Sequence, residues 1–168
     1  LRARRLVERG VRFVHVVSGW PDYVPDTERR SWDAHSDLDG NHGIQARMVD
    51  KPIAGLLADL KSRGLLDSTL VVVATEFGRP PEFDGRGGRG HQGSAFTMVL
   101  AGGGLRHRGA HGVTDDSGKK VVEGGVSIPD FHATILAAMG VNPGLELMDG
   151  TRPVPATDGG RPVEVLMG

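Results

Sequence analysis

The sequence predicts an α/β fold in which helices cover a mainly parallel sheet. Short apolar segments alternate with helical patterns along the chain, which is the order typical of this class. The segment Thr69–Thr75 is apolar or β-branched at successive positions, as expected for a strand buried on both faces of a parallel sheet. With 168 residues, the chain is long enough for one domain with its own core.

The first part of the chain predicts a helix and a strand, followed by a long polar segment. Residues 1–10 have the pattern of a helix that ends at a glycine, without an initiator Met or a signal peptide. We therefore expect a fragment, with residues 1–168 forming a single partial domain. Residues 11–17 are rich in β-branched side chains and predict a first strand. Residues 18–43 are polar and predict a long loop, which is uncommon unless it has a function.

The middle of the chain predicts a helix followed by a strand and a loop. The helix over Ile44–Arg63 has an apolar stripe and Gly64 as its stop. The strand Thr69–Thr75 follows, and then a glycine-rich loop, Gly78–Gly93. The stripe consists of residues spaced i, i+3, i+4 and i+7, which are Ile53, Leu56, Leu57 and Leu60.

The last third predicts one more strand and one more helix. Ala95–Ala101 is the third strand, and the irregular residues 105–125 include a hairpin turn at Asp116–Gly118. The helix Pro129–Met139 has proline in its first turn and a glycine stop after its last residue. From Asn142 onward, the Pro- and Gly-rich tail is expected to run over the surface.

Composition excludes several classes of partner and site. The net charge is −1, from 20 basic and 21 acidic residues, so no basic surface for nucleic acid or an anionic membrane is expected. No apolar run approaches the roughly 20 residues that a membrane-spanning helix needs. The absence of cysteine excludes disulfides and thiolate metal sites.

Three loops hold side chains suited to binding a metal. Asp33 and His35 lie in the first loop, Glu76 and Arg79 directly follow the central strand, and His91 lies between glycines. Asp, Glu and His without Cys suit Zn²⁺, Mn²⁺, Fe or Ca²⁺. The alternatives are solvated or capping residues for the acids and histidines, and a plain ion pair between Arg79 and Glu76. The carboxyl ends of strands in open α/β sheets are where ligands bind, which favours a site.

Several motifs together resemble a known family. In one order, the chain contains Ser31–His35, Gly40–His42, Asp50–Ala54, Asp59–Leu70, Thr75–Arg79, Gly88–His91, Leu100–Gly104 and Asp130–Leu136. This set resembles the C-terminal part of the bacterial family known as domain of unknown function 1501, in its planctomycete-type branch. That family in turn resembles the alkaline phosphatase and sulfatase superfamily. The resemblance extends from about residue 10 to the end of the chain.

The resemblance implies a fold and a site. The fold would be the C-terminal portion of an alkaline-phosphatase-like three-layer sandwich with a mainly parallel sheet. Asp33, His35, Glu76 and His91 would bind a divalent ion, such as Zn²⁺, Mn²⁺ or Ca²⁺, and Arg79 would be catalytic. The substrate would be a small anionic ester or a sulfated glycan. The full-length protein would be exported to the periplasm or the cell exterior.

The chain also departs from the family pattern. Phe77 stands where sulfatase-type relatives carry a histidine, Gly90 where an acidic residue precedes the histidine, and Pro80 where a threonine is usual. The nucleophile of the superfamily belongs to an N-terminal region outside this chain, so no residue here is assigned that role.

Two functions from different classes remain open. One is a metal-dependent hydrolase of phosphate or sulfate esters, similar to sulfatases. The alternative is a non-catalytic binding or scaffold protein on the same fold with an eroded metal site, which the departures at Phe77 and Gly90 favour. A carbohydrate-binding module is disfavoured, because sugar sites use exposed rings and the chain has only two Trp and one Tyr.

Overall fold

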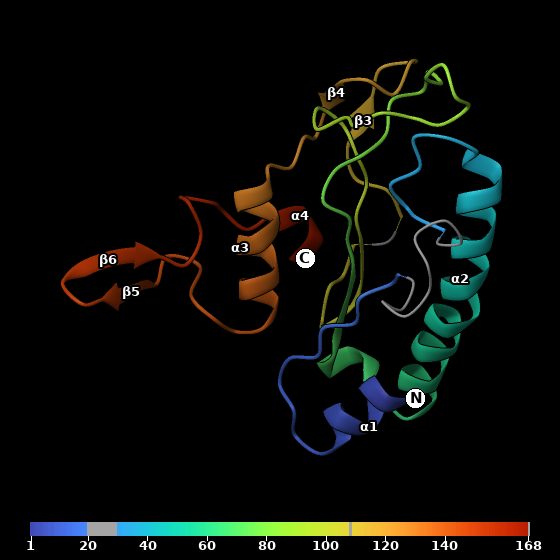
Figure 1. The fold of residues 1–168 in the computed structure, drawn as a ribbon. Helices are drawn as coiled ribbons and strands as arrows, with labels where there is room; N and C mark the ends of the chain where they lie inside the picture. Colours follow the sequence, from blue (N-terminus) through green and yellow to red (C-terminus); the bar gives the residue numbers. More distant parts are fainter. Residues whose placement is uncertain (20–29, 108, 168) are drawn as a thin grey trace. The chain divides into compact units, whose positions relative to one another are not determined.

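The computed structural model describes residues 1–19, 30–107 and 109–167 (Figure 1). The chain divides into two compact units. The first unit consists of Leu1–Arg63 and Phe77–Phe96, and the second of Gly64–Glu76 and Thr97–Gly168. Residues 20–29, within the predicted loop 18–43, lie outside the described residues.

Two helices form the frame of the first unit: α1 (Arg2–Glu8) and the long α2 (Leu38–Ser62) (Figure 1). The predicted helix over residues 44–63 is confirmed, but α2 begins six residues earlier. The Asp37 side chain explains the early start, because it accepts a hydrogen bond from the Gly40 N–H at 3.2 Å and so caps the first turn. Leu60 is 1 % exposed and belongs to the core of this unit.

The strand predicted over residues 11–17 is wrong, because this segment forms neither strand nor helix. Val16 and Val17 are 72 % and 79 % exposed. A β-branched run becomes a strand only when a neighbouring strand satisfies its backbone N–H and C=O groups, and no described segment pairs with this one.

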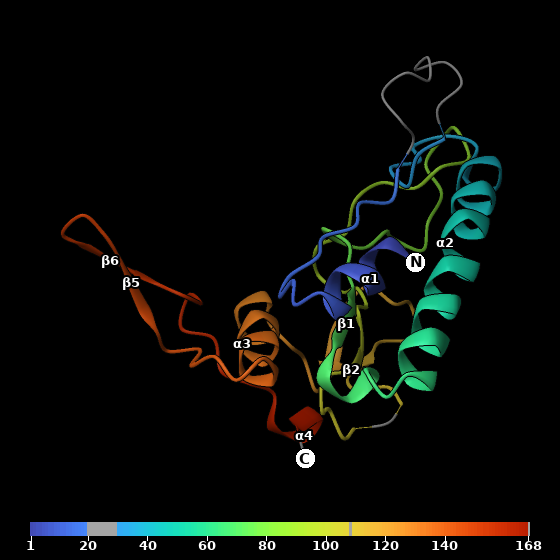
Figure 2. The same ribbon diagram turned by 90° about the horizontal axis from the view of Figure 1, so that it is seen from below.

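The second unit contains the strand predicted over residues 69–75. It is β1 (Leu70–Val73), which follows a single turn, η1 (Leu66–Ser68), and pairs with β2 (Val99–Gly102) (Figure 2). The register pairs Leu70 with Gly102 and Val73 with Val99, so the two strands are antiparallel. Gly102 must lack a side chain, because a Cβ there would lie 2.3 Å from the Leu66 carbonyl oxygen.

The remaining strands form two separate hairpins. The predicted turn at Asp116–Gly118 joins β3 (Val113–Thr114) to β4 (Val121–Glu123). In the tail, β5 (Glu146–Asp149) pairs with β6 (Arg152–Pro155), a hairpin that the sequence analysis missed.

The predicted sandwich with a mainly parallel sheet is therefore wrong. The described residues contain helices and three short antiparallel sheets of two strands each. A parallel pair needs a crossover connection, usually a helix, whereas residues 74–98 between β1 and β2 form no helix. The apolar character of residues 69–75 reflects partial burial of one short strand, since Val72 is 36 % exposed.

Helix α3 (Ile128–Ala138) confirms the helix predicted over residues 129–139. Ser127 caps its first turn, and Thr134 and Asp130 accept backbone hydrogen bonds from Val163 and Arg161 at 2.9 and 2.8 Å. These bonds attach to α3 the segment that leads into α4 (Glu164–Met167).

Among the described residues of either unit, few apolar side chains are fully buried. In the first unit, Ala34, Leu60 and Ala95 are buried, and in the second unit, Ala133. None of the described helices combines the length and the apolar character needed to cross a membrane.

Candidate metal centre

Two loops of the first unit carry the candidate side chains, and backbone hydrogen bonds hold these loops together. The loop before α2 contains Asp33 and His35, and the glycine-rich loop contains His91. The Arg89 N–H donates to the Ala34 carbonyl oxygen at 3.0 Å, and the Leu38 N–H donates to the Gly87 carbonyl oxygen at 3.1 Å. The site is thus built on backbone contacts as well as on side chains.

Gly88 allows the two loops to approach so closely. A Cβ at this position would lie 2.1 Å from the carbonyl carbon of His35 and 2.3 Å from the Ser36 nitrogen. A side chain at position 88 would therefore push the two loops apart, which explains why the sequence has glycine there.

The position of His91 depends on a second pairing within the glycine-rich loop. Gly78 and Gln92 exchange two backbone hydrogen bonds of 2.9 Å each. This pairing brings Phe77 against His91, with ring centroids 4.3 Å apart. Phe77, which follows the predicted ligand Glu76 in the sequence, therefore packs on the predicted ligand His91.

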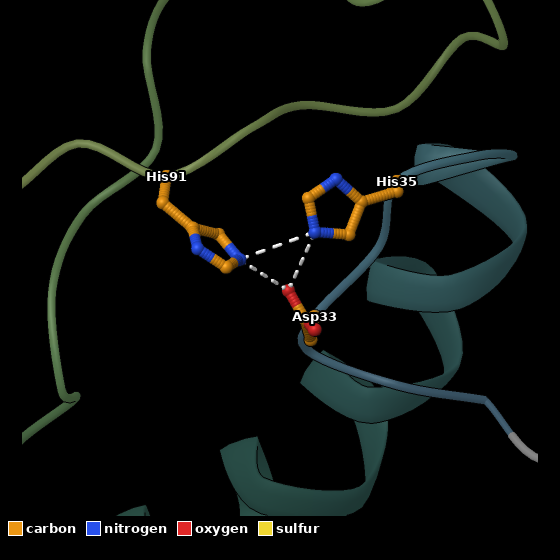
Figure 3. Close-up of side chains that lie close together, drawn as sticks. All are labelled: Asp33, His35 and His91. Atoms are coloured by element: carbon orange, nitrogen blue, oxygen red, sulfur yellow. Dashed lines mark hydrogen bonds and ion pairs between the residues drawn. The ribbon is translucent and has the colours of Figure 1, made fainter.

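Asp33, His35 and His91 converge on one point (Figure 3). Asp33 Oδ1 lies 3.1 Å from His35 Nε2 and 2.9 Å from His91 Nε2, and the two Nε2 atoms are 3.1 Å apart. Among the described residues, this is the group of His and carboxylate side chains that could hold a metal ion. The structure thus brings together three of the four predicted ligands.

Arg79 also reaches this point. Its Nη2 donates to Asp33 Oδ1 at 2.5 Å, and its Nη1 donates to the carbonyl oxygens of Arg89 and Gly90 at 3.0 and 3.3 Å. The Arg79 hydrogen bond, and then that of His91, lowers the pKa of Asp33 from 3.8 to about 2. Asp33 is therefore ionised at neutral pH, as a metal ligand must be.

The convergent side chains are open to solvent, with 54 % of Asp33, 49 % of His35 and 48 % of His91 exposed. An open cavity of about 520 Å³ adjoins them and is lined by His35, Asp84, Gly85 and Arg86. The site is therefore accessible to an ion and to a small molecule.

The distances and the donor types fit a divalent metal. Ligand atoms bound to one ion at about 2.1 Å lie about 3.0 Å apart when the bonds are at right angles, and about 3.4 Å apart in a tetrahedral site. The three observed separations are 2.9, 3.1 and 3.1 Å. Two imidazole nitrogens favour Zn²⁺ or a similar ion over Ca²⁺, which takes oxygen ligands. Asp33, His35 and His91 would hold such an ion.

Glu76, the fourth predicted ligand, follows β1 in the second unit and is exposed. It contributes no atom to the group formed by Asp33, His35 and His91, so its role as a ligand stays a prediction. Arg79, for which an ion pair with Glu76 was one alternative, pairs with Asp33.

Sequence reasoning missed Asp84. Its Oδ1 accepts hydrogen bonds from the backbone N–H groups of Arg86 and Gly88 at 3.2 and 3.1 Å, and its Oδ2 lies 3.7 Å from His35 Nδ1. The turn signal Asp84–Gly85 was present in the sequence, but it did not indicate which histidine the turn would face.

Comparisons with known proteins identify a family and no closer relative. The sequence profile of a family described as "Protein of unknown function (DUF1501)" matches residues 1–167. Searches of the curated proteins and of the solved structures gave no match. Because the profile covers almost the whole sequence, the chain belongs to the DUF1501 family of proteins of unknown function.

Proposed function

We propose that this chain carries the metal centre of a hydrolase that acts on phosphate or sulfate esters. The observation behind the proposal is the convergence of Asp33, His35 and His91 within 3.1 Å of one another beside an open cavity. The sequence resemblance to sulfatase-like enzymes supports this reaction class, although the described residues do not form the sandwich that this resemblance implied.

The side chains of the site would have two roles, metal binding and orientation of a ligand. Asp33, His35 and His91 would bind the ion, and Arg79 would orient the Asp33 carboxylate through its hydrogen bond. A divalent ion bound there would supply Lewis-acid chemistry for ester hydrolysis, polarising an ester oxygen and lowering the pKa of water.

Arg86 is the cation best placed to meet an anionic substrate. It lines the cavity beside His35, and its side chain has no hydrogen bond or ion pair within the described part of the chain. Arg79, by contrast, already donates to Asp33 and to two carbonyl oxygens. A guanidinium that the described residues leave unpaired can form paired hydrogen bonds with a phosphate or sulfate group.

The test is hydrolysis of 4-nitrophenyl phosphate and 4-nitrophenyl sulfate by protein loaded with Zn²⁺ or Mn²⁺. We expect turnover that EDTA removes and that the variant His35→Ala/His91→Ala lacks. Arg86→Gln should raise KM more than it lowers kcat, whereas Arg47→Gln, an exposed position on α2, should change neither. Metal-loaded protein without activity on either ester class would contradict the hydrolase.

A second candidate is a non-catalytic binding protein. The observation that favours it is the short ion pair between Arg79 and Asp33, because this guanidinium already neutralises the carboxylate. In that case the Arg79 guanidinium would neutralise Asp33 in place of a metal ion. The two candidates differ in one measurable property, since the binding protein would remain free of metal after dialysis against Zn²⁺ and Mn²⁺.

A further inference from the structure

We propose that Asp84 is a positioning residue that fixes the orientation and the tautomer of His35, an inference that rests on the proposed metal centre. His35 can bind a cation through Nε2 only if Nε2 carries a lone pair, which in a neutral imidazole places the proton on Nδ1. The Asp84 carboxylate is the group that lies opposite Nδ1, with Oδ2 at 3.7 Å.

Asp84 is itself held in place by the backbone. Its Oδ1 accepts two backbone hydrogen bonds, from Arg86 and Gly88, and its own N–H donates to the Gly88 carbonyl oxygen at 2.8 Å. These bonds leave Oδ2 as the oxygen that faces His35. A carboxylate anchored by one oxygen and presented by the other is suited to orient a ring.

The separation between Asp84 and His35 is set by the contact at Gly88. The backbone of Gly88 lies directly against the carbonyl carbon of His35, and the bond from Arg89 to Ala34 secures the same contact. The loop that carries Asp84 therefore cannot move away from His35 without breaking backbone hydrogen bonds.

A distance of 3.7 Å is an ion-pair contact and is longer than a hydrogen bond. Cation binding at Nε2 withdraws electrons from the ring and makes the Nδ1–H a stronger donor. We therefore expect the Asp84 contact to shorten when the ion binds. Mutation of the carboxylate in such a carboxylate–histidine–metal arrangement typically weakens metal binding by about 10- to 100-fold.

The variant Asp84→Asn tests this role with little disturbance of the loop. The Asn carbonyl oxygen can still accept from Arg86 and Gly88, whereas its NH₂ group would face Nδ1 of His35. A donor opposite Nδ1 favours the tautomer with the proton on Nε2, which opposes cation binding. Asp50→Asn, at an exposed position in α2, is the matched control.

The measurements are Zn²⁺ affinity by calorimetry and the His35 tautomer by ¹⁵N NMR of the metal-free protein. We expect Asp84→Asn to bind Zn²⁺ about 10- to 100-fold more weakly and to shift the His35 tautomer equilibrium toward Nε2–H relative to the parent, with unfolding temperature unchanged. Affinity within twofold of the parent, or a loss that follows a lower unfolding temperature without a tautomer change, would overturn the inference. If the parent binds no Zn²⁺, the proposed function fails, and the tautomer measurement alone still decides the role of Asp84.

Discussion

Two charged clusters in the first unit are each organised around one aspartate, and they differ in the partners that this aspartate has. Asp59 binds Arg4 and Arg63 at 2.9 and 2.7 Å, and both arginines also contact Glu8. In the second cluster, Asp33 has one arginine and two histidines. In both clusters, arginine hydrogen bonds lower the pKa of the aspartate.

The difference shows which cluster can bind something else. The cluster around Asp59 pairs two acids with two arginines, and a guanidinium only donates hydrogen bonds. It therefore has no nitrogen lone pair to offer, and its effect is to join α1 to α2. The cluster around Asp33 contains imidazole nitrogens that can act as ligands. Residue type, rather than the shifted pKa, separates the structural cluster from the candidate site.

The largest expected difference between variants of the two clusters is in how much Zn²⁺ stabilises the protein against unfolding. At a Zn²⁺ concentration of 100 times Kd, binding adds about 2.7 kcal/mol to the free energy of unfolding, or about 5–10 °C in unfolding temperature for a chain of this size. We expect this shift in the parent and in Arg4→Ala, and none in His35→Ala/His91→Ala. Calorimetric melts with and without Zn²⁺ measure it. An equal shift in parent and double variant would place the ion elsewhere.

For Arg4→Ala, we expect lower stability of the metal-free protein and unchanged affinity for Zn²⁺. Arg4 is 8 % exposed and connects α1 to Asp59 of α2, so its loss should lower the unfolding temperature by a few degrees in metal-free protein. Zn²⁺ affinity should stay within twofold of the parent value. A loss of Zn²⁺ affinity without a change in stability would break the distinction between the two clusters.

A smaller effect is expected on the pKa of Asp33. Removal of the Arg79 hydrogen bond in Arg79→Gln should raise this pKa from about 2 toward 3.8. Because the folded-state pKa lies below the ordinary value, the bond stabilises the metal-free parent above about pH 4, and this contribution is lost as pH falls toward 2. Carboxyl ¹³C NMR titration reports the pKa. An unchanged Asp33 pKa in the variant would show that Arg79 does not hold the carboxylate.

The smallest effect is expected at Phe77. The variant Phe77→Leu removes the ring that packs on His91 at 4.3 Å but keeps an apolar side chain. Aromatic pairs contribute about 0.5–1.5 kcal/mol beyond their buried area, so Zn²⁺ affinity should fall by about 2- to 10-fold. Calorimetric titration of variant and parent measures this. No change in affinity would mean that the ring does not position His91.

Local signals predicted helices α1, α2 and α3, but not α4, and three of the side chains that meet at the candidate site. Helix α3 has its cap and its glycine stop within the sequence, so its limits follow from nearby residues. His91 was identified because no apolar neighbours explain a histidine between glycines, and the structure places it beside Asp33 and His35.

The sheets could not be predicted in the same way. Whether Leu70–Val73 pairs in parallel or antiparallel depends on a partner strand about 30 residues away, and the apolar pattern carries no record of direction. The contact of Asp84 with His35 likewise depends on how the loop around Gly88 docks, which no sequence spacing reveals.

The central claim is that Asp33, His35 and His91 bind one divalent ion. The most direct test is elemental analysis of the parent after dialysis against Zn²⁺ and then against metal-free buffer, beside Asp33→Asn, Glu76→Gln and His35→Ala/His91→Ala. We predict close to one ion per chain in the parent and none in the double variant. The Glu76→Gln sample decides whether that residue is a ligand. A parent without bound metal, or a double variant with as much metal as the parent, would contradict the account.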